Sequence, residues 1–258
     1  MINSPKNVLI SGASSGIGRE LALVYAKSDV NLFLCGRSQK KLNEVKKLCE
    51  NRGAKVSVKI FDVSDEKSAA DFIEEIEILH EIDLVIANAG IRGGEATSAE
   101  NFAKIKEIFS TNVSGVINVI HPAIEKMKLR KKGQVAIISS LAGFCGIPSS
   151  PAYSASKAAV RVYAEGLRGN LLQHGINVSA ICPGYVLTPM TQQNKFRMPF
   201  IMSVEKTAQI IKKGLEKNKS RIAFPFPLYL AVLFVSLLPR SAVDFVVNFI
   251  FSRIARKP

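Results

Sequence analysis

The chain has 258 residues, with 35 lysines and arginines against 21 aspartates and glutamates, and a formal net charge of +14. A chain of this length can bury a sizeable core without disulfides or metal ions, and it shows no composition break or internal repeat, so we expect one domain. The excess of positive charge indicates an anionic ligand or surface. The sequence has no zinc-finger or helix-turn-helix pattern and no basic stripe interleaved with aromatics, which argues against a nucleic-acid partner.

The four cysteines, Cys35, Cys49, Cys145 and Cys182, do not have the spacing of metal ligands or of a disulfide framework. We therefore expect reduced thiols, no metal ion and a cytoplasmic protein. Residues 1–6 contain no long apolar region and no small-residue cleavage site, so a secretory signal is not expected.

The first expected element is a strand over residues 7–10, which runs into a glycine-rich turn and then into a helical pattern over residues 19–26. Glycine lets the backbone approach a pyrophosphate closely, and the helix amino terminus offers free N–H groups and a partial positive charge. The order of strand, turn and helix therefore predicts a dinucleotide site. Its predicted residues are Gly12, Ser14, Ser15, Gly16, Ile17 and Gly18.

A second strand is expected over residues 31–35, and it ends at Arg37. Enzymes that use NAD usually carry an acidic residue near this position for the ribose 2′-hydroxyl, whereas an arginine accommodates a 2′-phosphate. Arg37 therefore predicts NADP(H) as the cofactor. The alternative is an ordinary solvated arginine where the strand meets a charged surface helix over residues 39–51.

The third and fourth strands are expected over residues 55–61 and 83–87, with a helix over residues 64–79 between them. A long helical pattern then covers residues 99–132 and contains Asn112, although asparagine is a modest helix former. Small and polar residues follow the two strands: Asp62 and Val63 after the third, and Asn88, Ala89 and Gly90 after the fourth.

A buried strand over residues 135–138 delivers Ser140 to the carboxyl edge of the expected sheet, where open α/β sheets bind their ligands. Tyr153 and Lys157 are four residues apart and share one face of a helix that we expect to end near residue 174. A nearby ammonium stabilises a phenolate, so we expect Lys157 to lower the pKa of Tyr153. The Ser140 hydroxyl can then hydrogen-bond the substrate oxygen that Tyr153 protonates. A sixth strand, over residues 177–181, leads to Pro183, Gly184 and Thr188.

These motifs together resemble the short-chain dehydrogenase/reductase family over about residues 6–190. The resemblance rests on the spacing Gly-x-x-x-Gly-x-Gly from Gly12, on the Asn88-Ala89-Gly90 turn, and on Ser140 with Tyr153 thirteen residues later and Lys157 after it. It implies an α/β fold, in which a single Rossmann-like domain holds a doubly wound parallel sheet of about seven strands with helices on both faces.

The resemblance also implies a role for each matched residue. Asp62 reads the adenine amino group, the Asn88 turn supports the sheet edge beside the cofactor ribose, and Thr188 anchors the nicotinamide carboxamide. Asn112 sits at a local kink, where it holds a water that links Lys157 to solvent. Lys157 holds the nicotinamide ribose hydroxyls. The implied catalytic set is Asn112, Ser140, Tyr153 and Lys157, with no metal.

Past residue 190 the chain departs from the family, because the usual glycine-rich carboxyl-terminal strand is missing. We expect a helix over residues 204–217 and a short last strand over residues 221–224, which would close a domain of residues 1–224. The extension, residues 225–258, begins with an uncharged run over residues 225–239 that is too short to span a membrane.

An amphipathic helix with a basic end is expected over residues 241–255. Two interpretations of these extra carboxyl-terminal helices stay open. They could lie on an anionic membrane surface, or they could cover the substrate cleft or form a subunit interface. Both interpretations favour a lipophilic substrate.

The sequence therefore predicts an NADP(H)-dependent oxidoreductase that reduces a ketone on a lipophilic molecule, such as a 3-keto lipid or a 3-oxoacyl group. A dehydrogenase of a steroid-like or other secondary alcohol is the alternative within the enzyme class. A non-catalytic NADP-binding regulator is the alternative outside it. The family resemblance implies a homo-oligomer, either a dimer or a tetramer, in the cytoplasm with or without membrane association.

Overall fold

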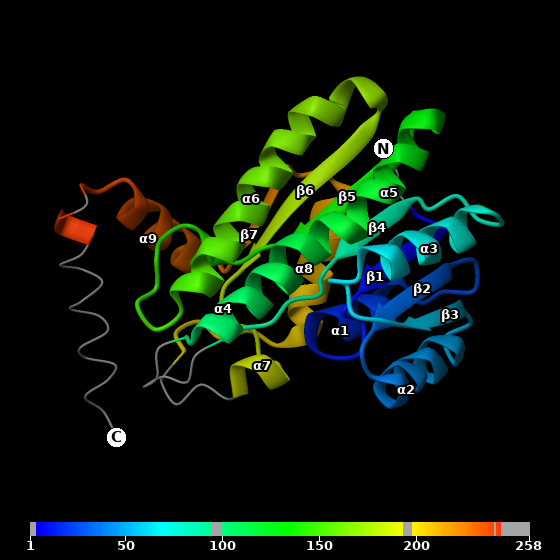
Figure 1. Cartoon of the computed structure of the whole chain (residues 1–258), viewed down its shortest axis with the longest axis horizontal. Coiled ribbons are helices and arrows are strands. Elements are labelled where there is room, and N and C mark those ends of the chain that lie inside the picture. The colour runs from blue at the N-terminus through cyan, green and yellow to red at the C-terminus, as the bar shows by residue number, and fades with distance from the viewer. Residues whose placement is uncertain (1–3, 94–99, 193–197, 240, 244–258) are drawn as a thin grey trace.

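The computed structural model describes residues 4–93, 100–192, 198–239 and 241–243. Within these residues seven parallel strands form one sheet in the order β3-β2-β1-β4-β5-β6-β7 (Figure 1). This sheet confirms the predicted Rossmann-like, doubly wound fold. The strands are β1 (Asn7–Ser11), β2 (Asn31–Gly36), β3 (Lys55–Ile60), β4 (Leu84–Ala87), β5 (Gly133–Ile138), β6 (Ile176–Pro183) and β7 (Arg221–Phe224).

The central strands are apolar throughout because both faces of the sheet are covered. In β1 the side chains of Val8 and Ile10 point to one core cluster and Leu9 points to the other. The first cluster lies under α1 (Gly16–Tyr25), α2 (Gln39–Glu50) and α8 (Val204–Glu216). The second lies under α3 (Glu66–Glu77), α5 (Gly115–Arg130) and α6 (Pro151–Leu171).

The chain changes direction across the sheet after β3, so that β1 lies between β2 and β4. Val8 of β1 pairs with Leu32 of β2 on one side and with Leu84 of β4 on the other. Loops leaving neighbouring strands in opposite directions open a crevice at their carboxyl ends, which is where such sheets bind ligands. Most of the functional residues predicted from sequence follow these strand ends, whereas Asn112, Tyr153 and Lys157 lie in helical segments.

The long helix predicted over residues 99–132 is interrupted. The described part consists of α4 (Phe102–Phe109), a single π-helical turn (Ser110–Ser114) and α5, which ends at Arg130. A π turn inserts one extra residue into the helix and changes the direction of the side chains around it. The kink that the family resemblance implied at Asn112 therefore lies in this turn.

The carboxyl-terminal region continues from β7 into α9 (Phe226–Ser236). Among the described residues, none of the helices is long and apolar enough to cross a bilayer. Most of the amphipathic helix predicted over residues 241–255 lies outside the described residues.

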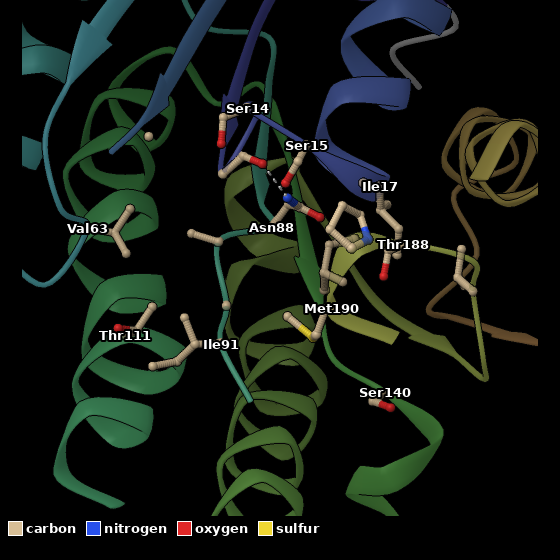
Figure 2. Close-up of a pocket in the computed structure, with 18 of the residues that line it drawn as sticks. Ser14, Ser15, Ile17, Val63, Asn88, Ile91, Thr111, Ser140, Thr188 and Met190 are labelled. Atoms are coloured by element: carbon tan, nitrogen blue, oxygen red, sulfur yellow. Dashed lines mark hydrogen bonds between the residues drawn. The ribbon is translucent and has the colours of Figure 1, made fainter. Parts of the chain in front are cut away.

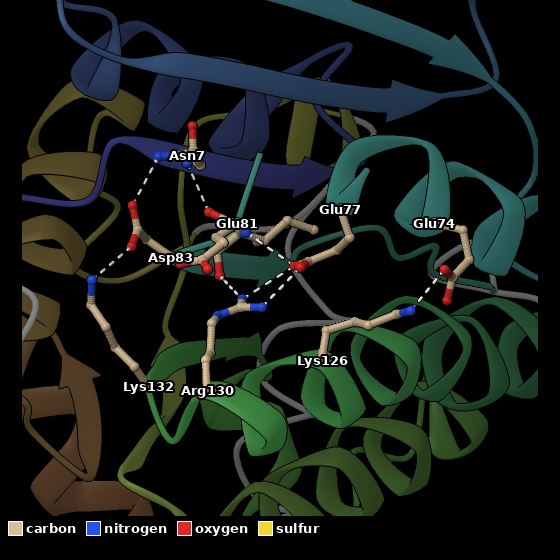
Figure 3. A network of polar contacts seen from close by, with 9 residues as sticks. Asn7, Glu74, Glu77, Glu81, Asp83, Lys126, Arg130 and Lys132 are labelled. Atoms are coloured by element: carbon tan, nitrogen blue, oxygen red, sulfur yellow. Dashed lines mark hydrogen bonds and ion pairs between the residues drawn. The ribbon is translucent and has the colours of Figure 1, made fainter. Parts of the chain in front are cut away.

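Ion pairs join α3 and α5 at the amino edge of the sheet, opposite the crevice (Figure 3). Arg130 donates to both carboxylate oxygens of Glu77, at 2.8 and 3.2 Å, and to the carbonyl oxygen of Ile82 at 2.6 Å. Lys126 pairs with Glu74 at 2.8 Å. These contacts hold the two helices to the start of β4 and leave the carboxyl edge free for ligands.

Candidate active site

The glycine turn after β1 is shaped by two glycines with left-handed backbone conformations, Gly12 at φ +64° and Gly16 at φ +55°. A Cβ at Gly12 would lie 2.7 Å from the Cα of Ala89, so a larger residue would push the turn away from the end of β4. No described side chain caps the amino terminus of α1 at Ser15, which leaves its first N–H groups available to an anion. The turn therefore has the shape and the donors that a pyrophosphate needs.

The Asn88 side chain fastens this turn to the end of β4. Its amide nitrogen donates to the carbonyl oxygens of Ser11 and Gly12, both at 3.1 Å. The Ser11 hydroxyl in turn accepts hydrogen bonds from the backbone nitrogens of Asn88 and Ala89, both at 3.1 Å. Ser11 was not predicted from the sequence, because a buried serine at a strand end carries no recognisable pattern.

A cavity of about 450 Å³ opens along the carboxyl ends of the strands (Figure 2). In Figure 2, Ser14, Ser15 and Ile17 lie at one end of the cavity and Ser140 lies at the other, with Asn88 between them. Its lining includes these predicted residues: Gly12, Ser14, Ser15, Gly16, Ile17, Arg37, Asp62, Val63, Asn88, Ala89, Gly90, Ser140, Tyr153, Lys157, Pro183, Gly184 and Thr188.

Two predicted residues, Gly18 and Asn112, do not line this cavity. Gly18 lies inside the turn, where an added Cβ would collide with the Asn88 amide and the Gly12 carbonyl. It supports the close packing of turn and helix rather than touching a ligand. Asn112 is fully buried behind the cavity wall.

Arg37 and Asp62 lie together at the end of the cavity formed by β2 and β3. The guanidinium of Arg37 is 3.5 Å from the Asp62 carboxylate. Burial raises the pKa of Asp62, but hydrogen bonds from Ser64 and the charge of Arg37 outweigh it and hold the pKa below its usual value. Ser38 and Lys41 line the same end, so this part of the cavity contains two cations.

The reacting groups meet where β5 ends against α6. The Ser140 hydroxyl donates to the carbonyl oxygen of Pro183 at 3.4 Å and accepts from the backbone nitrogen of Ala142 at 3.1 Å, and it lines the same cavity as Tyr153. The Lys157 ammonium donates to the carbonyl oxygen of Ile138 at 2.9 Å and lies 5.9 Å from the centre of the Tyr153 ring. The structure thus brings together the serine, tyrosine and lysine that were predicted from widely separated parts of the chain.

Burial, rather than the charge of Lys157, has the largest effect on the pKa of Tyr153 in this structure. Burial raises the pKa of Tyr153, and the opposing contributions come from the hydrogen bond with Ser140 and the charge of Arg92. Burial also lowers the pKa of Lys157 from 10.5 to about 8. Lys157 therefore loses its charge at a lower pH than the one at which Tyr153 ionises.

Asn112 connects the π turn to the strand end and to α6. Its amide accepts from the backbone nitrogen of Ile91 at 2.8 Å and donates to the Ile91 carbonyl at 2.9 Å and to the Ser156 hydroxyl at 3.0 Å. A Cβ at Gly90 would lie 3.2 Å from the Lys157 ammonium and 3.3 Å from the Asn112 oxygen. The absence of a side chain at Gly90 therefore leaves space in which these two groups converge.

A second, smaller cavity of about 160 Å³ shares Ser140, Tyr153, Gly184, Met190 and Thr191 with the first. It is mostly apolar, and α9 contributes Leu228 and Val232 to its wall. The residues that line it and that the sequence did not indicate are Arg92, Leu141, Ala142, Cys145, Ile147, Ser149, Ser150, Tyr185, Met190, Thr191, Leu228 and Val232.

A cluster of polar and aromatic contacts anchors α9 beside this second cavity. The ring of Tyr229 packs edge-on against the ring of Phe144, with ring centres 5.7 Å apart. Phe144 lies four residues after Ser140 in the chain. The Tyr229 hydroxyl accepts from Arg221 at 3.1 Å, and Arg221 also pairs with Glu165 of α6 at 2.5 Å. The guanidinium of Arg161 lies 4.5 Å over the Phe144 ring. The start of α9 is thus fixed to the catalytic segment.

The four cysteines are free thiols, as the sequence predicted. Cys35, Cys49 and Cys182 are buried, whereas Cys145 is half-buried and lines the second cavity. The described residues hold no group of three His, Cys, Asp or Glu side chains that could bind a metal.

Comparison with known proteins places the chain in a family. The family model described as short chain dehydrogenase matches residues 6–198. The chain therefore belongs to the short-chain dehydrogenase family, whose members are oxidoreductases. The family match covers the glycine turn, the Asn88 turn and the Ser140, Tyr153 and Lys157 set, and it ends before α8, β7 and α9.

Three curated relatives are similar over most of the chain. An uncharacterized oxidoreductase of Myxococcus xanthus is 33% identical over 93% of this chain and 96% of its own length. The ketoacyl reductase HetN of a Nostoc species is 31% identical over 83% of this chain and 76% of its own. A fatty acyl-CoA reductase of Acinetobacter baylyi is 31% identical over 84% and 75%.

Solved structures agree with the fold. A variant of the actinorhodin polyketide ketoreductase with NADPH has a TM-score of 0.78 at 25% identity and covers 88% of this chain and 98% of its own. A short-chain dehydrogenase of Mycobacterium paratuberculosis bound to NAD has a TM-score of 0.75 at 23% identity, and covers 84% and 94%. The fold therefore accommodates either nicotinamide cofactor.

Proposed function

We propose that this chain is an NADPH-dependent reductase of a ketone on a lipophilic molecule. The observation that carries the proposal is that Ser140 and Tyr153 line both cavities. The larger cavity begins at the glycine turn, and the smaller one is apolar. A cofactor in the first and a substrate in the second would meet at the Tyr153 phenol.

The side chains at this junction suit proton transfer to a ketone oxygen. When bound, a reduced nicotinamide supplies the hydride for the carbonyl carbon. Tyr153 donates a proton to the oxygen, and the Ser140 hydroxyl hydrogen-bonds that oxygen and orients it. Because burial raises the pKa of Tyr153, the phenol stays protonated at neutral pH. A protonated phenol is the form that reduction requires, whereas oxidation of a secondary alcohol requires the phenolate.

The residues around the first cavity fit a dinucleotide. Gly12 and Gly16 have the conformations that bring the turn close to a pyrophosphate. Thr188 packs against Gly16, where an added Cβ would lie 3.3 Å from the threonine methyl group. We assign the nicotinamide carboxamide to Thr188, the adenine to Asp62 and Val63, and the ribose hydroxyls to Lys157. As the last member of the proton relay, Asn112 would hold a water that links Lys157 to solvent.

The preference for NADPH rests on the cations at the ribose end. Arg37 and Lys41 both line the cavity beside Ser14 and Ser38, so a 2′-phosphate there would meet two positive side chains. Arg37 is ion-paired with Asp62 at 3.5 Å, but its side chain is 60% exposed and can turn toward a phosphate. The similar polyketide ketoreductase carries NADPH.

The lipophilic substrate class rests on the second cavity and on the relatives. Most of the surface that the wall exposes to the cavity is apolar, and Leu141, Ile147, Leu228 and Val232 contribute to it. Two relatives are named for ketoacyl and fatty acyl-CoA reduction. A 3-keto lipid or a 3-oxoacyl group combines the ketone and the long apolar chain that this arrangement would accept.

The test is a titration of the purified protein with NADPH and NADH, followed by ketones of increasing chain length while the absorbance of the reduced nicotinamide is recorded. We expect tighter binding of NADPH and turnover that improves with chain length. Tyr153→Phe should keep cofactor binding and lose turnover by about 10²-fold or more. Tyr163→Phe, on the same helix, is the control and should retain activity.

Each part of the proposal can fail separately. If NADH bound more tightly than NADPH, Arg37 could not be assigned to the 2′-phosphate. Faster oxidation of a secondary alcohol at neutral pH would favour the dehydrogenase alternative. Tight cofactor binding without turnover on any ketone or alcohol would show a cofactor-binding regulator instead of an enzyme.

A further inference from the structure

We propose that the outer face of α9 binds to the surface of an anionic lipid bilayer, so that a lipophilic substrate can pass from the bilayer into the second cavity. The substrate part rests on the proposed function. The docking part rests on the structure and charge of the chain, and it can be tested without any substrate.

Helix α9 has two apolar faces with different surroundings. The outer face carries four exposed large apolar side chains: Phe226, Leu230, Phe234 and Leu237. At about 100° per residue these four fall within about 80° of the helix circumference. Leu228 and Val232 fall on the opposite side, where they line the second cavity. One helix therefore connects the substrate cavity with an exposed apolar surface.

The exposed apolar side chains on the outer face of α9 indicate that another molecule binds there. Phe234 is 65% exposed and Leu237 is 78% exposed, and residues 225–239 include no charged side chain. A helix that is apolar all round is normally buried on every side. Because Tyr229 is fixed to Phe144 and Arg221, the start of α9 is held in place with its outer face turned away from the domain. The apolar residues are thus held at the surface.

The positive charge of the chain favours an anionic lipid surface as the partner that binds this face. At a formal charge of +14, the chain would be attracted to an anionic bilayer. The sequence after α9 adds Arg253, Arg256 and Lys257. Exposed phenylalanine and leucine side chains together with basic residues are the combination that binds peripheral proteins to anionic membranes.

The second cavity lies beside the same helix, which relates membrane binding to substrate access. Leu228 and Val232 line the second cavity together with Tyr153 and with Met190 of α7 (Pro189–Gln192), whose side chain is 37% exposed. The helix that would touch the bilayer is therefore also a wall of the cavity. A bilayer against the outer face of α9 would lie one helix away from this cavity, which would shorten the path of an acyl chain from lipid to Tyr153.

The test compares two double variants that introduce the same charge. Phe234→Glu with Leu237→Glu alters the outer face of α9, and Leu129→Glu with Leu172→Glu alters two exposed leucines near the opposite, amino edge of the sheet. Flotation with phosphatidylcholine vesicles containing phosphatidylserine should recover the wild type and the control. The outer-face variant should bind about tenfold less or weaker still. Vesicles of phosphatidylcholine alone should recover less of the wild type.

A second pair, Phe234→Ser with Leu237→Ser, removes apolar area without adding charge and should also lose flotation. All variants should retain wild-type turnover of a short, water-soluble ketone, while the outer-face variants should lose activity on a long-chain ketone supplied in vesicles. Equal flotation of outer-face variant and control would overturn the proposal. So would a wild type that ignores anionic vesicles and forms a dimer that the outer-face variant dissociates. Flotation does not depend on turnover, so a failure of the proposed function would be seen separately.

Discussion

Burial controls the protonation of the two ionisable side chains at the junction of the cavities. It raises the pKa of Tyr153, which keeps the phenol able to donate a proton, and it lowers the pKa of Lys157 to about 8. Both changes follow from the same cause, because a low-dielectric surrounding disfavours whichever form is charged. The site therefore carries an energetic cost in the folded state that a purely structural position would avoid.

The first prediction concerns this cost at Lys157. Below pH 8 the lysine is protonated in both the folded and the unfolded chain, so the penalty of burying its charge is fully present. Between pH 8 and 10.5 the folded chain releases the proton before the unfolded chain does, and stability rises with pH. At about 1.4 kcal/mol per pH unit, complete relief corresponds to about 3 kcal/mol.

The measurement is the free energy of unfolding of wild type and Lys157→Met by urea at pH 7, 8, 9 and 10. We expect the wild type to gain stability relative to the variant as the pH rises through this window. The difference between the two proteins cancels the other titrating groups. A constant difference would show that Lys157 keeps its ordinary pKa.

The second prediction concerns Arg92, whose charge lowers the pKa of both Tyr153 and Tyr185. Oxidation of an alcohol requires the Tyr153 phenolate, so its rate should rise as the pH approaches the tyrosine pKa. Arg92→Met removes the positive charge and should move this rise to higher pH. Arg92→Lys keeps the charge and should leave the pH profile near that of the wild type. The profile of kcat/KM for alcohol oxidation measures the shift, and an unchanged profile for Arg92→Met would rule out the electrostatic role.

The sequence predicted the residues that belong to local motifs and missed those that reach the site from elsewhere. Tyr153 and Lys157 are four residues apart, so helical geometry alone places them together. Arg92 and Leu228 reach the second cavity from distant segments, and neither stands in a pattern that indicates a ligand. Even for Lys157, the four-residue spacing predicted that the ammonium lies near the phenol. It did not predict that the ammonium donates a hydrogen bond to the backbone carbonyl of Ile138.

Among the elements, the π turn between α4 and α5 has the most direct link to the site. Asn112 makes three hydrogen bonds there, two of them to the backbone of Ile91 directly after the Asn88-Ala89-Gly90 turn. The π turn thus positions Ile91, which lines the first cavity, through the buried side-chain amide of Asn112. A side chain that satisfies both the donor and the acceptor of one residue holds that strand end in a single conformation.

The third prediction follows from these bonds. Asn112→Ala would leave the nitrogen and the carbonyl oxygen of Ile91 without these partners, at a cost of about 1–3 kcal/mol for each group that stays buried. At about 2–4 °C per kcal/mol for a domain of this size, we expect the Tm to fall by at least about 4 °C if both groups stay buried. Asn118→Ala is the control, because Asn118 also donates to backbone carbonyls, those of Val63 and Ser64, but from a more exposed position. Thermal unfolding followed by circular dichroism should show a smaller fall for the control. An equal fall in Tm for the two variants would mean that the Asn112 hydrogen bonds contribute no more to stability than those of Asn118.

The strands and most helices could be predicted from the sequence because their signals are local. Apolar runs predicted buried parallel strands, and the 3.6-residue period predicted α3 and α8 within a few residues of their ends. The π turn could not be predicted this way. Its extra residue is stabilised by Ile91 and Ser156, which lie far from Asn112 in the sequence, so no local pattern indicates it.

At the scale of the whole molecule, the first cavity is built from the ends of six strands. The segments at the ends of β1 to β6 all contribute lining residues, and the core clusters on the two faces of the sheet hold these segments in register. A ligand that touches all of them ties the β3 side of the sheet to the β6 side. Binding should therefore stabilise the entire domain instead of one loop.

The fourth prediction measures this coupling together with the cofactor preference. NADPH at about 100 times its Kd should add about 2.7 kcal/mol to the folded state, which corresponds to a rise of about 5–10 °C in Tm for a domain of this length. NADH at the same concentration should give a smaller rise, because it lacks the phosphate that Arg37 and Lys41 would contact. Arg37→Ser should bring the two rises closer together while leaving the rise with NADH in place, since the glycine turn and the Asn88 turn are unaltered. An Arg37→Ser protein that still distinguishes the two cofactors as the wild type does would place the selectivity elsewhere in the cavity, with Lys41 as the next side chain to replace.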